Sequence, residues 1–282
     1  MALDLTQMTP ELILAFSVTL AAGLATGIGS AIAFFTTHTN RAFFAISIGF
    51  SAGVMIYLSF VEILPKATEY IGKEVDSVSA SVITTAALIG GMILMALLDF
   101  LVPSAANPHE NTKVEIFDDK SKEAKEYAAK NKLLLRTGVV TALAIAMHNF
   151  PEGLATFLLV LDDPAVGIAL AVAVAMHNIP EGIAVSVPVF YATKSRKKAF
   201  GYSFLSGLSE PAGAVIGFLI LAPFLTDFLL GIIFAGVGGV MVFLAIDTLL
   251  PTARNSDRGH LSVYGVILGI LVMSVSLILF QV

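Results

Sequence analysis

Two nearly identical polar blocks interrupt an apolar sequence: "AMHNFPEGLA" at 146–155 and "AMHNIPEGIA" at 175–184. Over 142–155 and 171–184 the two copies agree at 10 of 14 positions, with an offset of 29 residues. Inside an apolar segment each polar group must be satisfied or it costs free energy, so a doubled block is unexpected for packing alone. The repetition indicates a chemical task.

The composition is that of an integral membrane protein. Of 282 residues, 57% are hydrophobic and 13% are charged, and the mean hydropathy is +0.89. The chain has no Cys, which excludes disulfides, thiolate metal sites and a cysteine nucleophile. A net charge of -5 and the lack of a basic patch interleaved with aromatic residues indicate no nucleic-acid partner.

Apolar stretches divide the chain into eight predicted spans of one all-α transmembrane domain, residues 1–282. A helix needs about 20 residues to cross the hydrocarbon layer. The predicted spans are 11–35, 42–64, 78–102, 137–161, 165–191, 199–222, 224–250 and 261–280. Between the third and fourth, residues 103–135 predict a solvated cytoplasmic loop with a short helical part near 121–132.

The distribution of cationic residues predicts the orientation. The N-terminal segment carries no positive charge before its apolar run, so we do not expect a cleaved signal peptide. If the N-terminus is outside, every Lys and Arg except Lys66 and Lys73 lies on the inner side. We therefore expect both termini to be extracytoplasmic.

Further internal similarity predicts an inverted repeat. Residues 51–65 resemble 237–251 at an offset of 186, and 23–32 resemble 207–216 at an offset of 184. The first and second spans thus resemble the sixth and seventh, and the fourth resembles the fifth. Completing the pattern gives a 3+2+3 arrangement, and many secondary transporters use such inverted repeats around a site at mid-depth.

Each polar block predicts a metal-binding helix face. Helical spacing puts His148, Asn149 and Glu152 on one side of their helix. Imidazole, carboxylate and amide groups together suit a divalent first-row metal better than Ca²⁺ or Mg²⁺. The proline in each block frees a backbone carbonyl one turn back. The second block supplies the equivalent residues His177, Asn178 and Glu181.

Other polar residues of the spans extend the predicted site. Glu210 lies deep in the sixth span, where no Lys or Arg could pair with it, so a metal is the better partner. Met55 either adds a thioether ligand or simply packs. Glu62 and Asp247, near opposite ends of the second and seventh spans, either mark the entrance and exit of a pathway or are solvated interfacial acids.

These patterns leave three functional hypotheses. The leading one is a metal importer that performs no covalent chemistry. The second is an intramembrane metal-dependent hydrolase, although the sequence has no HExxH and its two motif copies are equal, whereas hydrolases need unlike acid and base roles. The third is a proton-linked carrier of organic solutes.

Eight spans, a charged loop after the third, HNFPEG, HNIPEG and a Glu-Pro pair resemble the ZIP (Zrt/Irt-like) metal transporters, especially their bacterial broad-specificity and GufA-like branches. The resemblance covers essentially the whole chain. It implies transport of zinc, and variably iron, manganese, cadmium or cobalt, through the bacterial inner membrane towards the cytoplasm. It also implies that the metal is a substrate, that no prosthetic group is needed, and that a homodimer is one form of assembly in the lipid bilayer.

The resemblance further implies a two-metal centre between the fourth and fifth spans. The ligands of one position would be His148, Glu152, His177 and Glu181, with Met55 as an addition. The second position would use Asn149, Glu152, Asn178, Glu181 and Glu210, so that Glu152 and Glu181 bridge the two ions.

Overall fold

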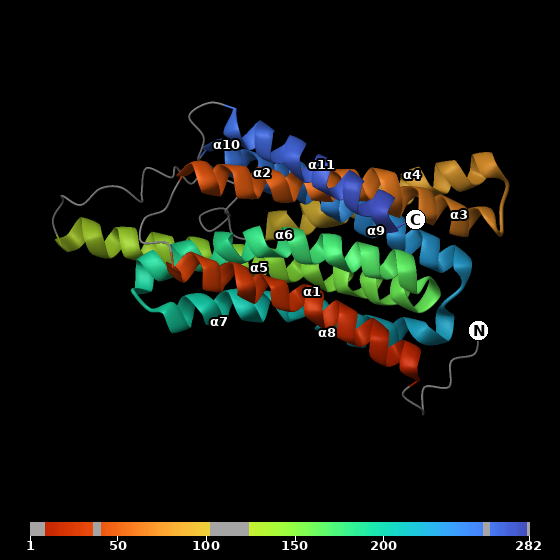
Figure 1. Cartoon of the computed structure of the whole chain (residues 1–282), viewed down its shortest axis with the longest axis horizontal. Coiled ribbons are helices and arrows are strands. Elements are labelled where there is room, and N and C mark those ends of the chain that lie inside the picture. Colours follow the sequence, from red (N-terminus) through yellow and green to blue (C-terminus); the bar gives the residue numbers. More distant parts are fainter. Residues whose placement is uncertain (1–8, 36–40, 102–123, 256–259, 281–282) are drawn as a thin grey trace.

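The computed structural model describes residues 9–35, 41–101, 124–255 and 260–280, which are helical almost throughout (Figure 1). Eight helical segments are long and apolar enough to cross a membrane, as the sequence predicts. The elements are α1 (Pro10–Phe35), α2 (Arg41–Leu58), η1 (Ser59–Ile63), α3 (Leu64–Gly72), α4 (Ser77–Leu101), α5 (Ala124–Asp162), α6 (Pro164–Thr193), α7 (Arg196–Gly207), α8 (Ser209–Leu221), η4 (Ala222–Phe224), α9 (Asp227–Leu244), η5 (Ala245–Leu249), α10 (Leu250–Asn255) and α11 (Leu261–Phe280).

The helices form two groups that lie side by side (Figure 1). Helices α1, α5, α6, α7 and α8 pack mainly on one another and form the motif group, which carries both polar blocks. Helices α2, α3, α4, α9, α10 and α11 form the second group. The groups meet where α6 lies against α2 and α11 and where α5 lies against α9. The motif helices α5 and α6 therefore border the interface between the groups.

The second group has the antiparallel arrangement that an inverted repeat predicts. α3 packs on α9, and α10 packs on α2, so the end of the second span lies beside the start of the seventh, and the end of the seventh beside the start of the second. Helix α1 begins and α11 ends at the end of the bundle where the α3–α4 and α5–α6 corners also lie (Figure 1). We call this the outer end, following the predicted orientation.

A π-helical turn occurs at the same place in both repeats. Turn η1 (Ser59–Ile63) and turn η5 (Ala245–Leu249) lie 186 residues apart, which is the offset of the sequence repeat. Each turn is closed by an amide that donates to the carbonyl five residues before it. Pro65 and Pro251 follow the two turns. Since proline removes one donor and disturbs the preceding turn, the wider π turn lets both helices continue past it.

Several span boundaries differ from the prediction, and the seventh span runs from Asp227 to Asn255 rather than over 224–250. The second span runs to Gly72 rather than 64, because η1 absorbs the disturbance at Pro65. Helix α5 begins at Ala124, so the helical part expected in the loop continues directly into the fourth span, while 102–123 lie outside the described residues. The sixth span is broken at Leu208, between α7 and α8, just before Glu210.

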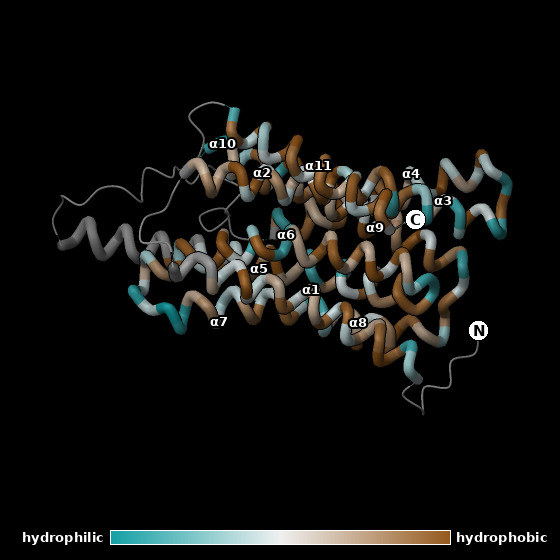
Figure 2. Tube along the Cα trace, in the orientation of Figure 1, coloured by the Kyte–Doolittle hydropathy of each residue, from teal (hydrophilic) through white to brown (hydrophobic). Residues whose placement is uncertain are grey.

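Hydrophobic residues predominate along the helices of both groups (Figure 2). Large hydrophobic residues are exposed on α4, α8 and α11, including Leu97, Leu219 and Leu271. These exposed hydrophobic residues lie on helices of membrane-spanning length, so the outer surface that they form fits a lipid environment. The histidine and glutamate side chains of the two polar blocks, by contrast, are buried inside the bundle.

Candidate metal centre

The two polar blocks meet in the interior of the motif group. Helices α5 and α6 pack against each other, and each contains a proline in its middle, Pro151 and Pro180. His148 is 5% exposed and Glu152 is 3% exposed. Asn149 and all three polar residues of the second block, His177, Asn178 and Glu181, are fully buried. The structure thus brings together the six motif residues that the sequence singled out.

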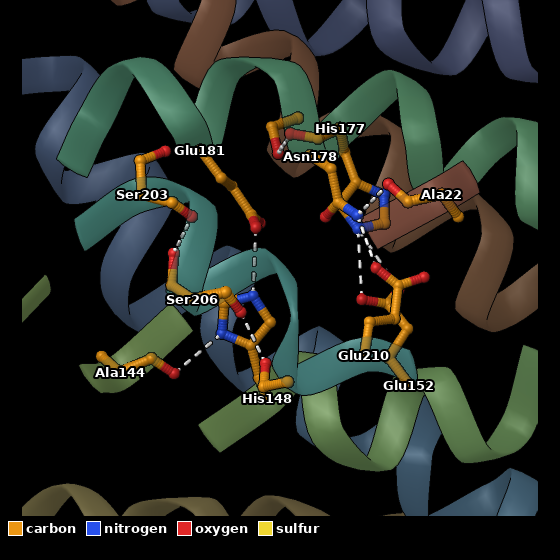
Figure 3. A network of polar contacts seen from close by, with 12 residues as sticks. Ala22, Ala144, His148, Glu152, His177, Asn178, Glu181, Ser203, Ser206 and Glu210 are labelled. Carbon is orange, nitrogen blue, oxygen red and sulfur yellow. Dashed lines mark hydrogen bonds and ion pairs between the residues drawn. The ribbon is translucent and has the colours of Figure 1, made fainter. Parts of the chain in front are cut away.

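The histidines and glutamates form two crossed pairs between the helices (Figure 3). His148 Nε2 on α5 lies 3.2 Å from Glu181 Oε2 on α6. His177 Nε2 on α6 lies 3.2 Å from Glu152 Oε1 and 3.3 Å from Glu152 Oε2 on α5. Each histidine therefore contacts the glutamate of the opposite block, and the pairs are related by the repeat.

The two asparagines differ in their surroundings. Asn178 Nδ2 donates to Glu210 Oε2 at 2.7 Å and to the Ala22 carbonyl at 3.0 Å, which ties α6 to α8 and α1 (Figure 3). Asn149 has no hydrogen-bond partner at either amide atom among the described residues. Glu210 follows the break at Leu208, in the first turn of α8, and is fully buried. The broken helix thus brings a third carboxylate to the blocks.

Several buried oxygen atoms at this site lack a hydrogen-bond partner within the described part of the chain. They are Glu181 Oε1, Glu210 Oε1, Asn178 Oδ1 and Asn149 Oδ1. Buried polar atoms are normally hydrogen-bonded, so a cluster of free lone pairs needs an explanation. Oxygen and imidazole donors together can accept a divalent transition metal.

In this arrangement the side chains are paired with one another and do not converge on a single point. Within the described ranges, no three His, Asp or Glu side chains are grouped so that they could hold a metal. The histidines and glutamates instead face each other in pairs. A cation that entered the site would take the place of these pairwise contacts.

Helix α2 reaches the centre from the second group. Met55 is fully buried on α2, which packs on α6, and it belongs to the main hydrophobic core. One turn earlier, Ser51 Oγ donates to the His177 carbonyl at 3.4 Å. Ser51 was not a predicted site residue, and its only sequence signal is its place at the start of the 51–65 repeat.

Glu62 and Asp247 lie in the second helix group and not on the motif helices. Glu62 is in η1 and partly exposed, and Asp247 is in η5 and exposed. Both acids thus occupy π-helical turns, which often occur at functional sites. Sequence reasoning paired the two acids but could not predict the turns.

Comparison with known proteins places these features in context. Residues 103–277 match the model of a family described as ZIP Zinc transporter. A protein named Zinc transporter ZupT from Lysinibacillus sphaericus (strain C3-41) is 54% identical over 272 residues, which cover 96% of this chain and 99% of that protein. Another of that name, from Streptococcus mutans serotype c (strain ATCC 700610 / UA159), is 52% identical over 273 residues, covering 97% and 100%. A third, from Clostridium perfringens (strain 13 / Type A), is 51% identical over 276 residues, covering 96% and 97%.

Proposed function

The chain belongs to the ZIP zinc transporter family, and from this premise we propose that it moves divalent transition-metal ions, chiefly zinc, through a bacterial inner membrane into the cytoplasm. The family consists of transporters rather than enzymes, so the metal is the substrate. The observation that carries the proposal is the crossed pairing of two buried histidines with two buried glutamates at the interface of the motif helices.

We assign the metal to two neighbouring positions. The first uses His148, Glu152, His177 and Glu181, with Met55 as a further ligand. The second uses Asn149, Glu152, Asn178, Glu181 and Glu210. Asn149 Oδ1, Asn178 Oδ1 and Glu210 Oε1 support the second position, because these oxygens are buried without a hydrogen-bond partner among the described residues.

The crossed pairs explain how such a site persists without metal. Buried carboxylates are costly unless they are paired, and each histidine offers its glutamate a partner. A divalent cation can replace both pairs at once, since the same Nε2 and carboxylate atoms become its ligands. When the ion binds, histidine–glutamate contacts are replaced by metal–ligand contacts, and when it leaves they form again. This exchange suits a substrate that must be released.

Glycine packing divides the molecule into two compact bodies. A Cβ added to Gly182 would lie 1.9 Å from Thr26 O, and one added to Gly153 would lie 2.0 Å from Glu210 O, both within the motif group. In the second group, Gly239 approaches Leu88 O in the same way. Every described glycine with such a neighbour meets a helix of its own group. At the described glycines, close backbone packing therefore joins helices of the same group.

This division supports alternating access by movement of one group against the other. The interface carries the motif helices on one side and α2 on the other. Glu62 would lie on the entrance side and Asp247 on the exit side, with both termini extracytoplasmic. The inverted repeat gives the outer and inner ends of the bundle related helix arrangements, so that either end could open in turn.

We propose that the range of transported metals is that of the broad-specificity, GufA-like branch. Carboxylate, imidazole and amide ligands accept iron, manganese, cadmium and cobalt as well as zinc. We propose these as further substrates and a homodimer in the bilayer as the assembly. A hydrolase fits the site less well, because the crossed pairs are equivalent and supply no distinct acid and base.

Metal uptake into proteoliposomes tests this function. Purified protein reconstituted around a trapped zinc indicator should admit external zinc, whereas liposomes without protein should not. A matched control is the surface variant Glu74→Gln, at an exposed position after α3, which should transport like the wild type. Zinc entry no faster than in empty liposomes would overturn the proposal.

A further inference from the structure

The corner between the two motif helices touches the second helix group at the outer end. Asp162 ends α5, and Asp163 caps the start of α6. The Tyr70 hydroxyl, on α3, donates to the Asp162 carboxylate. Lys66 Nζ, also on α3, lies 3.9 Å from Asp163 Oδ2. Two adjacent acids of the motif group are thus held by two residues of the other group.

Tyr70 is fixed firmly within its own group. It is 1% exposed, and its ring packs edge-on against Phe234 of α9 with centroids 5.7 Å apart. Lys73 Nζ lies 4.6 Å from the centre of the same ring and 3.1 Å from Asp227 Oδ2. These contacts leave the hydroxyl directed at the corner, so little freedom is lost when it bonds to Asp162.

The acceptors on the corner are fixed as well. Asp163 Oδ1 accepts from the Val166 amide at 3.2 Å and so caps α6, which leaves Oδ2 facing Lys66. Glu62 lies one helical turn before Lys66 on the same continuous helix. The contacts between the groups are therefore next to the acid assigned to the entrance side.

We propose that Tyr70–Asp162, supported by Lys66–Asp163, is a latch that keeps the outer end closed. The inference rests on the proposed transport function and orientation. A path from outside to the motif residues between the two groups needs the α5–α6 corner to move away from α3, and this movement breaks both contacts. Hydrogen bonds to charged groups are stronger than neutral ones, so the latch favours the closed arrangement.

Thiol labelling measures the latch directly, because the chain has no cysteine of its own. Ser59 is fully buried on the helix that carries Glu62, and Ser59→Cys makes it a reporter. A membrane-impermeant maleimide added outside should label this reporter about tenfold faster after Tyr70→Phe, which removes only the hydroxyl. Asp162→Asn, which keeps an acceptor without its charge, should give a smaller increase. Tyr202→Phe, at an exposed position on α7, should give none.

A second reporter separates opening of the latch from general loosening. Ser203→Cys lies fully buried on α7 within the motif group and should stay protected in every variant. Unchanged labelling at position 59 in both Tyr70→Phe and Asp162→Asn would overturn the latch, as would faster labelling at both reporters. The assay uses no metal, so it can fail while metal uptake succeeds, or the reverse.

Discussion

His148 Nε2 on α5 lies 3.2 Å from Glu181 Oε2 on α6, so neither polar block completes its own histidine–glutamate pair. The equivalent contact between His177 and Glu152 runs the other way across the same helix pair. Both helices must therefore be in place before either pair forms. Both blocks contribute to each pair, so a substitution in one block should also remove a partner from the other block.

The first prediction concerns the shared carboxylates. Glu152→Ala or Glu181→Ala should abolish zinc uptake, by more than about 100-fold, since loss of even an outer-shell partner costs about 10- to 100-fold in metal affinity. Each change removes a ligand assigned to both metal positions. Initial rates in proteoliposomes measure the loss, and circular dichroism should show unchanged helix content. Near-normal uptake by either variant would contradict the shared two-position site.

The two asparagines should respond differently to the same truncation. Asn178→Ala removes two hydrogen bonds that hold Glu210 and α1, so it should lower the free energy of unfolding by about 1–3 kcal/mol. Asn149→Ala removes no hydrogen bond to a described residue and should leave metal-free stability almost unchanged while weakening metal binding. Thermal unfolding with and without zinc compares them. Equal destabilisation by both variants would contradict the difference in hydrogen bonding between Asn178 and Asn149.

The glycine contacts predict a sharp contrast between two substitutions. Gly182→Ala would place a Cβ 1.9 Å from Thr26 O and should destabilise the protein by about 1–3 kcal/mol or more. Gly90→Ala meets nothing within 4 Å and should be neutral or stabilising by up to about 1 kcal/mol. Thermal stability in detergent distinguishes them. Tolerance of alanine at 182 would contradict the close α1–α6 packing.

Acidification should weaken metal binding. Imidazole and carboxylate bind metal only when deprotonated, so protons compete with the ion. Zinc affinity should therefore fall as the pH drops through the ordinary range of histidine titration, about 6.5, and below it. Equilibrium zinc binding across this range provides the measurement, and affinity that rises on acidification would refute the assignment of His148 and His177 as ligands.

The sequence predicts the eight spans and the six motif residues because their signals are local. Apolar length sets the spans, and helical spacing places His148 beside Glu152 on one face. The partner of each histidine depends instead on how α5 and α6 rotate against each other, which no local pattern records. The sequence therefore could not predict that His148 pairs with Glu181.

Other features depend on contacts between distant segments. Pro65 predicts a disturbed helix, but only packing decides that α2 continues through a π turn to Gly72. Tyr70 and Asp162 are 92 residues apart, and neither has a repeat partner that would mark it. The Tyr70–Asp162 hydrogen bond and the extended second span are visible only in the folded chain.

The central claim is that a divalent ion binds between the two polar blocks, and anomalous X-ray scattering from crystals soaked with zinc tests it most directly. We expect a zinc peak between α5 and α6, about 2.0–2.2 Å from the histidine and glutamate ligands of the first position. The peak should vanish in crystals of Glu181→Ala. Zinc bound only elsewhere, with the pairs His148–Glu181 and His177–Glu152 intact in a protein that transports zinc, would contradict the account.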